Sequence, residues 1–345
     1  MGGNGIELRS LSLVAWLLVG LAGVGCSAES REDGGGDADS DSDSDGDGDG
    51  DADGDADTDA DGDPTLGCEA IDILFIIDDS ASMEEEQNNL IASFPGFIEV
   101  LDNYLDPNDE PIEYRVGVTT TGVSREFTHD PLSLPPMPGD ITNAEDGALV
   151  GQEECGLGEH PWIEGDDPEA VDKFACAAEV GLLGPGTEMP LAAMELAIGE
   201  NLEPGGPNEG FYRKLESSLL VIVFITDEDD CSLEDGGTAV TTYTGGTCDP
   251  AESTGLESVE EKWQVLDTAA GGGGRYVVVS IAGMTPGGCT SSLGDASYAE
   301  RLMQVVDLSA PHSIAGDICG GDLAYPLGVA LDTITLACDE LPPLE

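Results

Sequence analysis

Four short runs of apolar, β-rich residues constrain the fold of this chain more than any other feature. None of them alternates with polar residues, so each is expected to be a strand covered on both faces. Amphipathic stretches typical of helices lie between the runs, and alternating strands and helices favour a mostly parallel sheet. The predicted strands are 71–77, 114–120, 219–226 and 276–282, and the predicted helices are 83–104, 188–198, 259–269, 298–306 and 326–337.

The predicted fold is therefore α/β, with a doubly wound, mostly parallel central sheet flanked by helices, in a domain over residues 67–345. The stretch from about 122 to 167 is rich in Pro, Gly and acidic residues and is predicted to be a long insertion rather than a second core. Gly271 to Gly274 precede a predicted strand instead of following one, which indicates a helix stop and not a phosphate-binding loop.

The first residues predict export. Arg9 precedes an apolar run over 11–24, which has the length of a signal-peptide core and is too short to span a bilayer. Small residues then lead to Cys26, which resembles the lipidated cysteine of bacterial lipoproteins, although Gly23 stands where those proteins prefer Leu. We expect a signal peptide over 1–25 and a lipid anchor at Cys26, with plain signal cleavage as the alternative. The predicted location is the cell envelope, as an outer-membrane or cell-surface lipoprotein.

Residues 26–66 are predicted to be a disordered acidic tether. Every odd position from Asp37 to Asp63 is aspartate, so charge repulsion is dense and nothing apolar can be buried. At about 3.3 Å per residue, the tether could reach roughly 100 Å when stretched. Its D-x-D-x-D-G segments resemble the first half of a calcium loop, but the acid required at the twelfth position is missing, which leaves only diffuse calcium binding.

The charge of the chain excludes one class of partner. Acidic residues outnumber basic ones 72 to 10, and the net charge is -62. Such a chain repels phosphate backbones and anionic membrane surfaces, so we expect no nucleic-acid binding and membrane contact through the lipid anchor only.

Eight cysteines remain when Cys26 is set aside, and an even number in an exported chain favours disulfides over metal thiolates. The sequence alone does not determine the pairing, and disulfide-bonded loop insertions are expected whichever cysteines pair. Our hypothesis joins neighbours along the chain and ties the two ends of the domain together: Cys155 with Cys176, Cys231 with Cys248, Cys289 with Cys319, and Cys68 with Cys338.

Polar residues follow two of the predicted strands, where ligands of open α/β sheets bind. The first strand runs into Asp78, Ser80 and Ser82, spaced as D-x-S-x-S, and the third runs into Asp227. Thr187 opens a predicted helix between them. Each has a structural explanation as well, since Ser82 and Glu85 could form a capping box, Thr187 could cap a helix and Asp227 could end a strand in a turn.

The joint occurrence of these residues, in this order, resembles the von Willebrand factor type A (vWA) family and its metal ion-dependent adhesion site. The resemblance implies a vWA fold and a metal site in which Asp78, Ser80 and Ser82 lie in the first ligand loop, Thr187 in the second and Asp227 in the third. It also implies Mg²⁺, with Mn²⁺ or Ca²⁺ as alternatives, and a protein partner that offers a carboxylate to the metal. Hydroxyls and few carboxylates suit Mg²⁺, which keeps several waters.

The predicted function is accordingly metal-dependent protein binding or adhesion, and no enzymatic activity is expected. The alternatives are a structural surface spacer with a stabilising metal and a metal-assisted hydrolase. His129, His160 and His312 are scattered among loop-like segments and suggest no general base. Two acidic trios, 84–86 and 228–230, are expected at the rim of the site, the first at a helix start and the second as a solvated loop.

Overall fold

The computed structural model describes residues 67–344 except 107, 133, 242–246, 292–293 and 322. The predicted signal peptide, Cys26 and the whole of the tether lie outside the described residues. Within the described part, no helix is both long and apolar enough to cross a bilayer.

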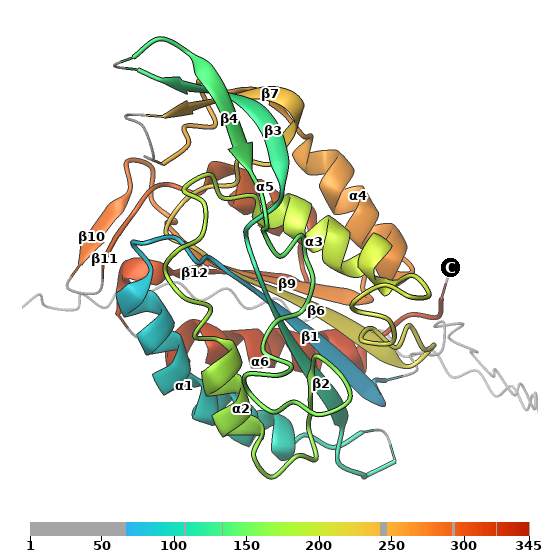
Figure 1. Ribbon diagram of the computed structural model, residues 1–345. Coiled ribbons are helices and arrows are strands. Elements are labelled where there is room, and N and C mark those ends of the chain that lie inside the picture. Colours follow the sequence, from blue (N-terminus) through green and yellow to red (C-terminus); the bar gives the residue numbers. More distant parts are fainter. Residues whose placement is uncertain are drawn as a thin grey trace, which may run out of the picture. The chain divides into compact units, whose positions relative to one another are not determined.

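A six-stranded central sheet confirms the predicted α/β fold (Figure 1). The strands lie in the order β12-β9-β6-β1-β2-β5, and all neighbouring pairs are parallel except β2 with β5. The four predicted strands are the four central ones of this order. Their bounds, with those of the two outer strands, are β1 Ala70–Ile77, β2 Glu113–Thr120, β5 Ile163–Glu164, β6 Ser218–Ile225, β9 Tyr276–Ala282 and β12 Ser313–Asp317.

Helices cover both faces of this sheet because its central strands are apolar on both sides. In β1, Ile71, Ile73, Phe75 and Ile77 pack in one core cluster with residues of α1, α2 and α6. Leu74 and Ile76 point the other way and pack in a second cluster with residues of α3, α4 and α5. Figure 1 shows the two helical layers. The helices are α1 Glu84–Asp102, α2 Ala170–Ala177, α3 Pro190–Ile198, α4 Val259–Ala270, α5 Glu300–Leu308 and α6 Ala324–Asp339, with the 3₁₀ turns η1 Glu200–Leu202 and η2 Ile318–Gly320.

The segment predicted to be a plain insertion contains regular structure that the sequence did not indicate. β3 (Arg125–Pro131) and β4 (Met137–Ile141) form a hairpin, and β3 also pairs in parallel with β7 (Leu233–Thr241). With β8 (Thr254–Leu256) they make a separate four-stranded sheet in the order β4-β3-β7-β8. The segment also supplies β5 to the edge of the central sheet. A further hairpin joins β10 (Cys289–Ser291) to β11 (Gly294–Ala296).

Four disulfides fasten the domain, and they are the pairs that we predicted from the sequence. Cys68 before β1 bonds Cys338 in α6, which ties the two ends of the domain together. The other three bonds are local and hold the additions to the fold. They join Cys155 to Cys176, Cys231 to Cys248 and Cys289 to Cys319.

Phe75 is central to the stability of the fold. Its ring lies 4.9 Å from that of Phe174 and 6.0 Å from that of Phe94, centroid to centroid, and it is completely buried. We expect Phe75→Ala to lower the free energy of unfolding by about 3–5 kcal/mol because the cavity cannot collapse between strand and helices. Urea denaturation with the disulfides intact measures this, and Leu336→Ala, at a position 46% exposed, is the control. Similar losses in both variants would contradict the prediction.

Candidate metal site

The register of two neighbouring strands builds the site. Ile77 at the end of β1 is paired with Ile225 at the end of β6, and the Asp78 amide donates to the Ile225 carbonyl at 2.9 Å. The chain after β1 continues to α1 on one face of the sheet, whereas the chain after β6 leads to α4 on the other face. Such a divergence opens a crevice at the carboxyl ends of the strands. The two loops that contain Asp78 and Asp227 flank this crevice.

Asp78 is completely buried and fixed by two hydrogen bonds. Its Oδ1 accepts from the Ser80 amide at 2.7 Å, and its Oδ2 accepts from the hydroxyl of Thr226 at 2.7 Å. Thr226 was not predicted as a site residue. The carboxylate is thus held in one orientation by its own loop and by the neighbouring strand.

The hydroxyls of Ser80 and Ser82 lie side by side, with 3.1 Å between their Oγ atoms. Adjacent ligands of an octahedral Mg²⁺ at 2.0–2.1 Å are about 2.9 Å apart, so this spacing suits two neighbouring coordination positions. The structural alternative for Ser82 is wrong, because α1 begins after Met83 and no side chain caps it. Neither the predicted capping box with Glu85 nor any other cap uses the exposed Ser82 hydroxyl.

Asp227 presents a buried carboxyl oxygen without a protein partner. The residue is buried, and no hydrogen bond within the described chain reaches its Oδ1. Its backbone carbonyl accepts from the Ser297 amide at 2.8 Å, which fixes the main chain at this point. A buried carboxylate oxygen without a partner is rare in folded proteins, and a bound cation would satisfy it.

The second loop contains Thr187 and an acid that sequence reasoning missed. Thr187 is buried three residues before α3, whose cap position is Met189, so the alternative of Thr187 as a helix cap is wrong. The next residue, Glu188, is completely buried. Its Oε2 accepts from the hydroxyl of Thr121, which follows β2, and its Oε1 has no hydrogen-bond partner among the described residues.

Short-range contacts fasten the second loop to the first. The side-chain amide of Gln87 in α1 donates to the carbonyl of Asp78 at 3.0 Å and to the carbonyl of Gly181 at 2.8 Å. The Gly184 amide donates to the carbonyl of Asp79 at 2.8 Å. A Cβ on residue 184 would lie 2.2 Å from the Asp79 carboxyl carbon, so a larger residue here would displace that side chain. Hydrogen bonds within the protein therefore join the loop before α3 to the loop after β1.

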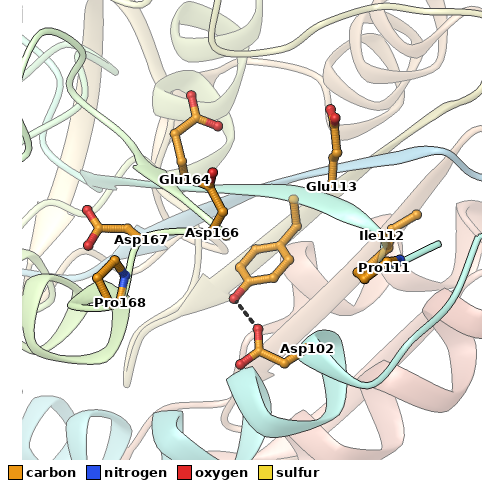
Figure 2. A pocket seen from close by; sticks show the side chains of 10 residues that line it. Asp102, Pro111, Ile112, Glu113, Glu164, Asp166, Asp167 and Pro168 are labelled. Carbon is orange, nitrogen blue, oxygen red and sulfur yellow. Dashed lines mark hydrogen bonds between the residues drawn. The ribbon is translucent and has the colours of Figure 1, made fainter.

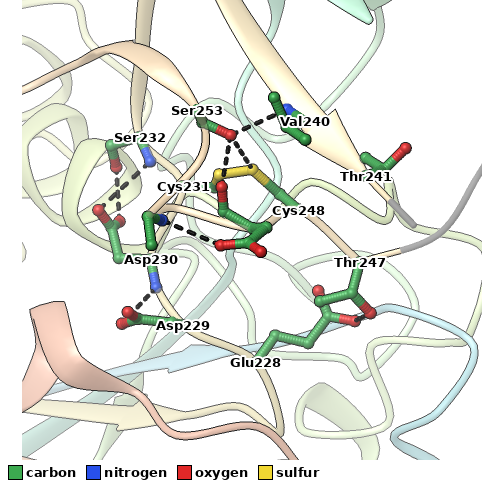
Figure 3. The surroundings of a disulfide bond; sticks show 12 residues. Glu228, Asp229, Asp230, Cys231, Ser232, Val240, Thr241, Thr247, Cys248 and Ser253 are labelled. Carbon is green, nitrogen blue, oxygen red and sulfur yellow. Dashed lines mark hydrogen bonds between the residues drawn. A yellow bond between two sulfur atoms is a disulfide. The ribbon is translucent and has the colours of Figure 1, made fainter. Parts of the chain in front are cut away.

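The third loop is not solvated as expected, because its acidic trio is buried and bonded (Figure 3). Asp229 accepts from the Arg301 amide at the start of α5 at 3.0 Å. Asp230 accepts from the Leu191 amide at the start of α3 at 3.0 Å and from the Arg301 guanidinium at 3.0 Å. Glu228 accepts from the Thr247 hydroxyl at 2.6 Å. These acids anchor the loop after Asp227 to two helix N-termini.

The acids around the crevice repel one another. Burial raises the pKa of Asp227 to about 7, and the charge of Asp78 adds to the rise, while the nearby Ser82 hydroxyl partly offsets it. Burial and Asp78 likewise raise the pKa of Glu188 well above its usual value. Burial raises the pKa of Glu228 to about 8 and, with the charges of Glu145 and Asp78, that of Asp79 to about 7. These carboxyls thus resist ionisation mainly because they are buried and because like charges lie nearby.

The donor set fits a hard divalent cation. The predicted ligands offer hydroxyl and carboxylate oxygens, which is the chemistry that Mg²⁺, Mn²⁺ or Ca²⁺ prefers. Among the described residues, the acidic and sulfur side chains that meet within 4.8 Å are not these ligands but Cys289, Asp317 and Cys319. The two cysteines of that group are joined in a disulfide, so they offer no thiolates to a metal.

The histidines lie on elements away from the site. His129 in β3 contacts the hydroxyl of Thr241 at 2.7 Å, and His160 stacks on Trp162. His312 lies in a bend before β12, as expected, and is buried near Glu340, whereas the position of His129 in a strand corrects the expectation of a loop.

A pocket of about 710 Å³ lies away from the predicted metal ligands, and none of them lines it (Figure 2). It is formed around Tyr114 at the amino end of β2, whereas the predicted ligands lie at the carboxyl ends of the strands. The Tyr114 hydroxyl donates to Asp102 at 2.8 Å and so joins β2 to the end of α1. We interpret this tyrosine as a packing residue.

No family model and no curated protein matches this sequence. Among solved structures, proximal thread matrix protein 1 from the mussel byssus is similar at a TM-score of 0.38 and 7% identity, over 79% of this chain and 49% of that chain. This chain thus spans about half the length of the mussel protein. Manganese-loaded TRAP protein from Plasmodium vivax is similar at a TM-score of 0.36 and 11% identity, over 79% of this chain and 75% of that chain. The pilus adhesin RrgA from Streptococcus pneumoniae is similar at a TM-score of 0.20 and 12% identity, over 49% of this chain and 21% of the adhesin chain.

The raised pKa values predict how the metal-free protein responds to pH. Unfolded Asp and Glu titrate near pH 4, whereas Asp227 and Glu228 titrate at about 7 and about 8 in the folded state. The folded state binds more protons between these values, so its stability falls as pH rises from about 4 to 8. In EDTA, we expect the melting temperature to be several degrees lower at pH 8.5 than at pH 5.

Substitutions test whether the fall in melting temperature with pH comes from Asp227 and Glu228 or from the large negative charge of the whole chain. The double variant Asp227→Asn, Glu228→Gln should reduce the difference between the two pH values, whereas Asp332→Asn, at an exposed position on α6, should leave it unchanged. An equal pH dependence in all three proteins would show that the buried acids are not its cause.

Proposed function

We propose that this protein is a metal-dependent binding or adhesion module, displayed on the bacterial cell envelope through the lipid anchor predicted at Cys26. The observation that supports it best is the pair of adjacent serine hydroxyls, Ser80 and Ser82, beside the buried and unpartnered carboxylate oxygen of Asp227. With Asp78, the two serines follow the D-x-S-x-S pattern of the vWA adhesion site, and Asp227 matches the aspartate of its third loop. The four disulfides agree with the proposed export, since such bonds are typical of exported proteins.

The proposed mechanism assigns a role to each ligand loop. Ser80, Ser82 and Thr187 would hold the ion through neutral hydroxyls, while Asp78 and Asp227 would hold it directly or through water. A divalent cation bound here supplies a Lewis-acidic position that a carboxylate of the partner can occupy. The hydrogen bonds from Ser80 and Thr226 keep Asp78 oriented, so that the exposed Ser82 side of the site faces the partner.

Two other functions are weighed against this one. A metal-assisted hydrolase needs a general base, which the three histidines do not supply but a buried carboxyl with a raised pKa, such as Asp227 or Glu228, could. Turnover of ester or phosphate substrates would favour this function. A surface spacer would use the metal only to staple the fold. The hydrogen bonds that already join the ligand loops favour the binding function over the spacer.

Metal titration tests the site itself. We expect Mg²⁺ or Mn²⁺ to bind at one site in isothermal calorimetry and the double variant Ser80→Ala, Asp227→Ala to weaken this binding by more than about 100-fold, because it removes ligands from two loops. Asp332→Ala on α6 should bind the ion as the wild type does. Binding that survives the double variant would exclude this site as the location of the metal.

Adhesion tests the function. Beads coated with the protein should be retained on bacterial or host surface proteins in Mg²⁺ and released by EDTA, and Ser80→Ala should abolish retention with an unchanged circular dichroism spectrum. The reason is that Ser80 contributes a metal ligand but is not part of a core cluster. The spacer function instead predicts that Asp227→Ala lowers the melting temperature and leaves retention as it was.

A further inference from the structure

A pocket of about 540 Å³ adjoins the proposed metal site on the side of the second loop. Asp79, which lies between Asp78 and Ser80 in the first ligand loop, is one of its walls. Asp140 and Glu145 line it from the insertion. Three acids thus share a pocket that begins one residue from the proposed metal ligands.

Asp79 is in an unusual position for an acid. It is 7% exposed, and its Oδ1 has no hydrogen-bond partner within the described chain. Glu145 is half-buried and accepts a hydrogen bond only from the hydroxyl of Thr120, at 2.8 Å, among the bonds that the structure shows for its side chain. A buried carboxyl stays ionised only when a cation or several donors compensate its charge, and otherwise it takes up a proton. The pocket therefore calls for positive charge from outside.

The described part of the chain does not supply that charge. Of its ten Lys and Arg residues, all but Arg9 and Arg31 lie in the described part, and seven of those eight bond groups elsewhere in the domain. Arg301, for example, pairs with Asp230, and Arg275 binds backbone carbonyls. The eighth, Lys214, is exposed just before β6, at the edge of the sheet opposite the site.

The lip of the pocket indicates what kind of cation fits. Ile141, Leu182, Leu183 and Pro185 line it beside the acids, and Leu183 is 100% exposed. A pocket with apolar residues beside carboxylates suits Lys or Arg. The aliphatic stem of such a side chain packs on the apolar surface while its charged end meets a carboxylate. A metal ion suits it less well, because a hard cation needs several oxygen ligands that converge on one point, whereas apolar side chains share the lining and Asp140 is exposed.

We propose that this pocket is a specificity site that binds a Lys or Arg side chain of the partner, next to the partner carboxylate that the metal site receives. The inference rests on the proposed function and narrows its partner to a segment with a basic residue close to an acidic one. It also explains how an acidic protein can attract an acidic ligand group, since the basic neighbour compensates the repulsion at the rim.

Fluorescence polarisation with synthetic peptides tests the pocket on the full chain. The probes are labelled Gly-Ser octapeptides with one aspartate and one arginine, separated by zero to four residues, and matched peptides in which citrulline replaces arginine. In saturating Mg²⁺, we expect the best arginine peptide to bind at least about ten-fold more tightly than its citrulline partner, as one partly buried ion pair provides.

Three variants locate the effect. Asp140→Asn with Glu145→Gln, and separately Asp79→Asn, should reduce the ratio of the two affinities towards one, with calorimetric Mg²⁺ binding retained in the first variant. Asp295→Asn is the matched control, because Asp295 lines a different pocket on the Ser82 and Asp227 side of the site. It should keep the preference for arginine.

The possible outcomes distinguish a failure of the specificity site from a failure of the proposed metal-dependent binding. Equal, EDTA-sensitive binding of the arginine and citrulline peptides would overturn the specificity site and leave the metal-dependent function standing. An equal loss of preference in Asp295→Asn would assign the effect to the general charge and also overturn the site. A second equivalent of Mg²⁺ or Ca²⁺ that disappears in the Asp140→Asn, Glu145→Gln variant would assign the pocket to a metal ion instead. No binding of metal or peptide would overturn both proposals.

Discussion

The in-register pairing of β1 with β6 is the interaction on which the rest of the site depends. It places Asp78 beside Thr226, whose hydroxyl binds the Asp78 carboxylate, and it brings Asp227 to the same edge of the sheet. The pairing exists because both strands are apolar on both faces and are buried between two layers of helices. A slip of one residue would turn the faces of β1 over and would also separate the two aspartates. Core packing and site geometry are therefore fixed by the same register.

The buried acids at this edge show how the fold uses its few positive charges. Asp230 is paired with Arg301 and accepts hydrogen bonds from the Leu191 amide and the Ser232 hydroxyl, so its burial is compensated within the domain. Asp227, Glu188 and Asp79 each keep a buried oxygen without a hydrogen-bond partner among the described residues. Seven of the eight Lys and Arg residues in the described part are bonded elsewhere, so a cation from outside would be needed to compensate these acids. The arrangement favours a binding site over a purely structural cluster.

Sequence reasoning predicted the parts of the site that follow directly from strand ends. The apolar runs end at Ile77 and Ile225, so the polar residues after them had to meet at the carboxyl edge of a parallel sheet. The roles of Glu188 and Gln87 were missed, because each depends on contacts with residues far away in the sequence. The only available signal for Glu188 was that it follows Thr187 directly.

The same limit explains the acidic loop and the second sheet. Asp229 and Asp230 were expected in solvent because no nearby residue indicates a partner, and Arg301 lies about seventy positions away. β3 was not predicted either, since it pairs with β7 more than a hundred residues along the chain. Long-range partners of polar residues are set by the assembled fold, whereas apolar periodicity is local and visible in the sequence.

The way in which the loops are fastened bears on what a metal would do here. Gln87 joins the first loop to the second, Asp230 joins the third loop to α3, and Cys231 bonds both Cys248 and, through its amide, the carbonyl of Glu188. None of these contacts needs an ion. A metal would therefore enter a frame that is already formed, and little of its binding energy would be spent on ordering the chain. A metal that only stabilises the fold would be expected where the loops have no other contacts to hold them. Because these loops are already joined, the structure favours an ion whose remaining coordination position binds a partner.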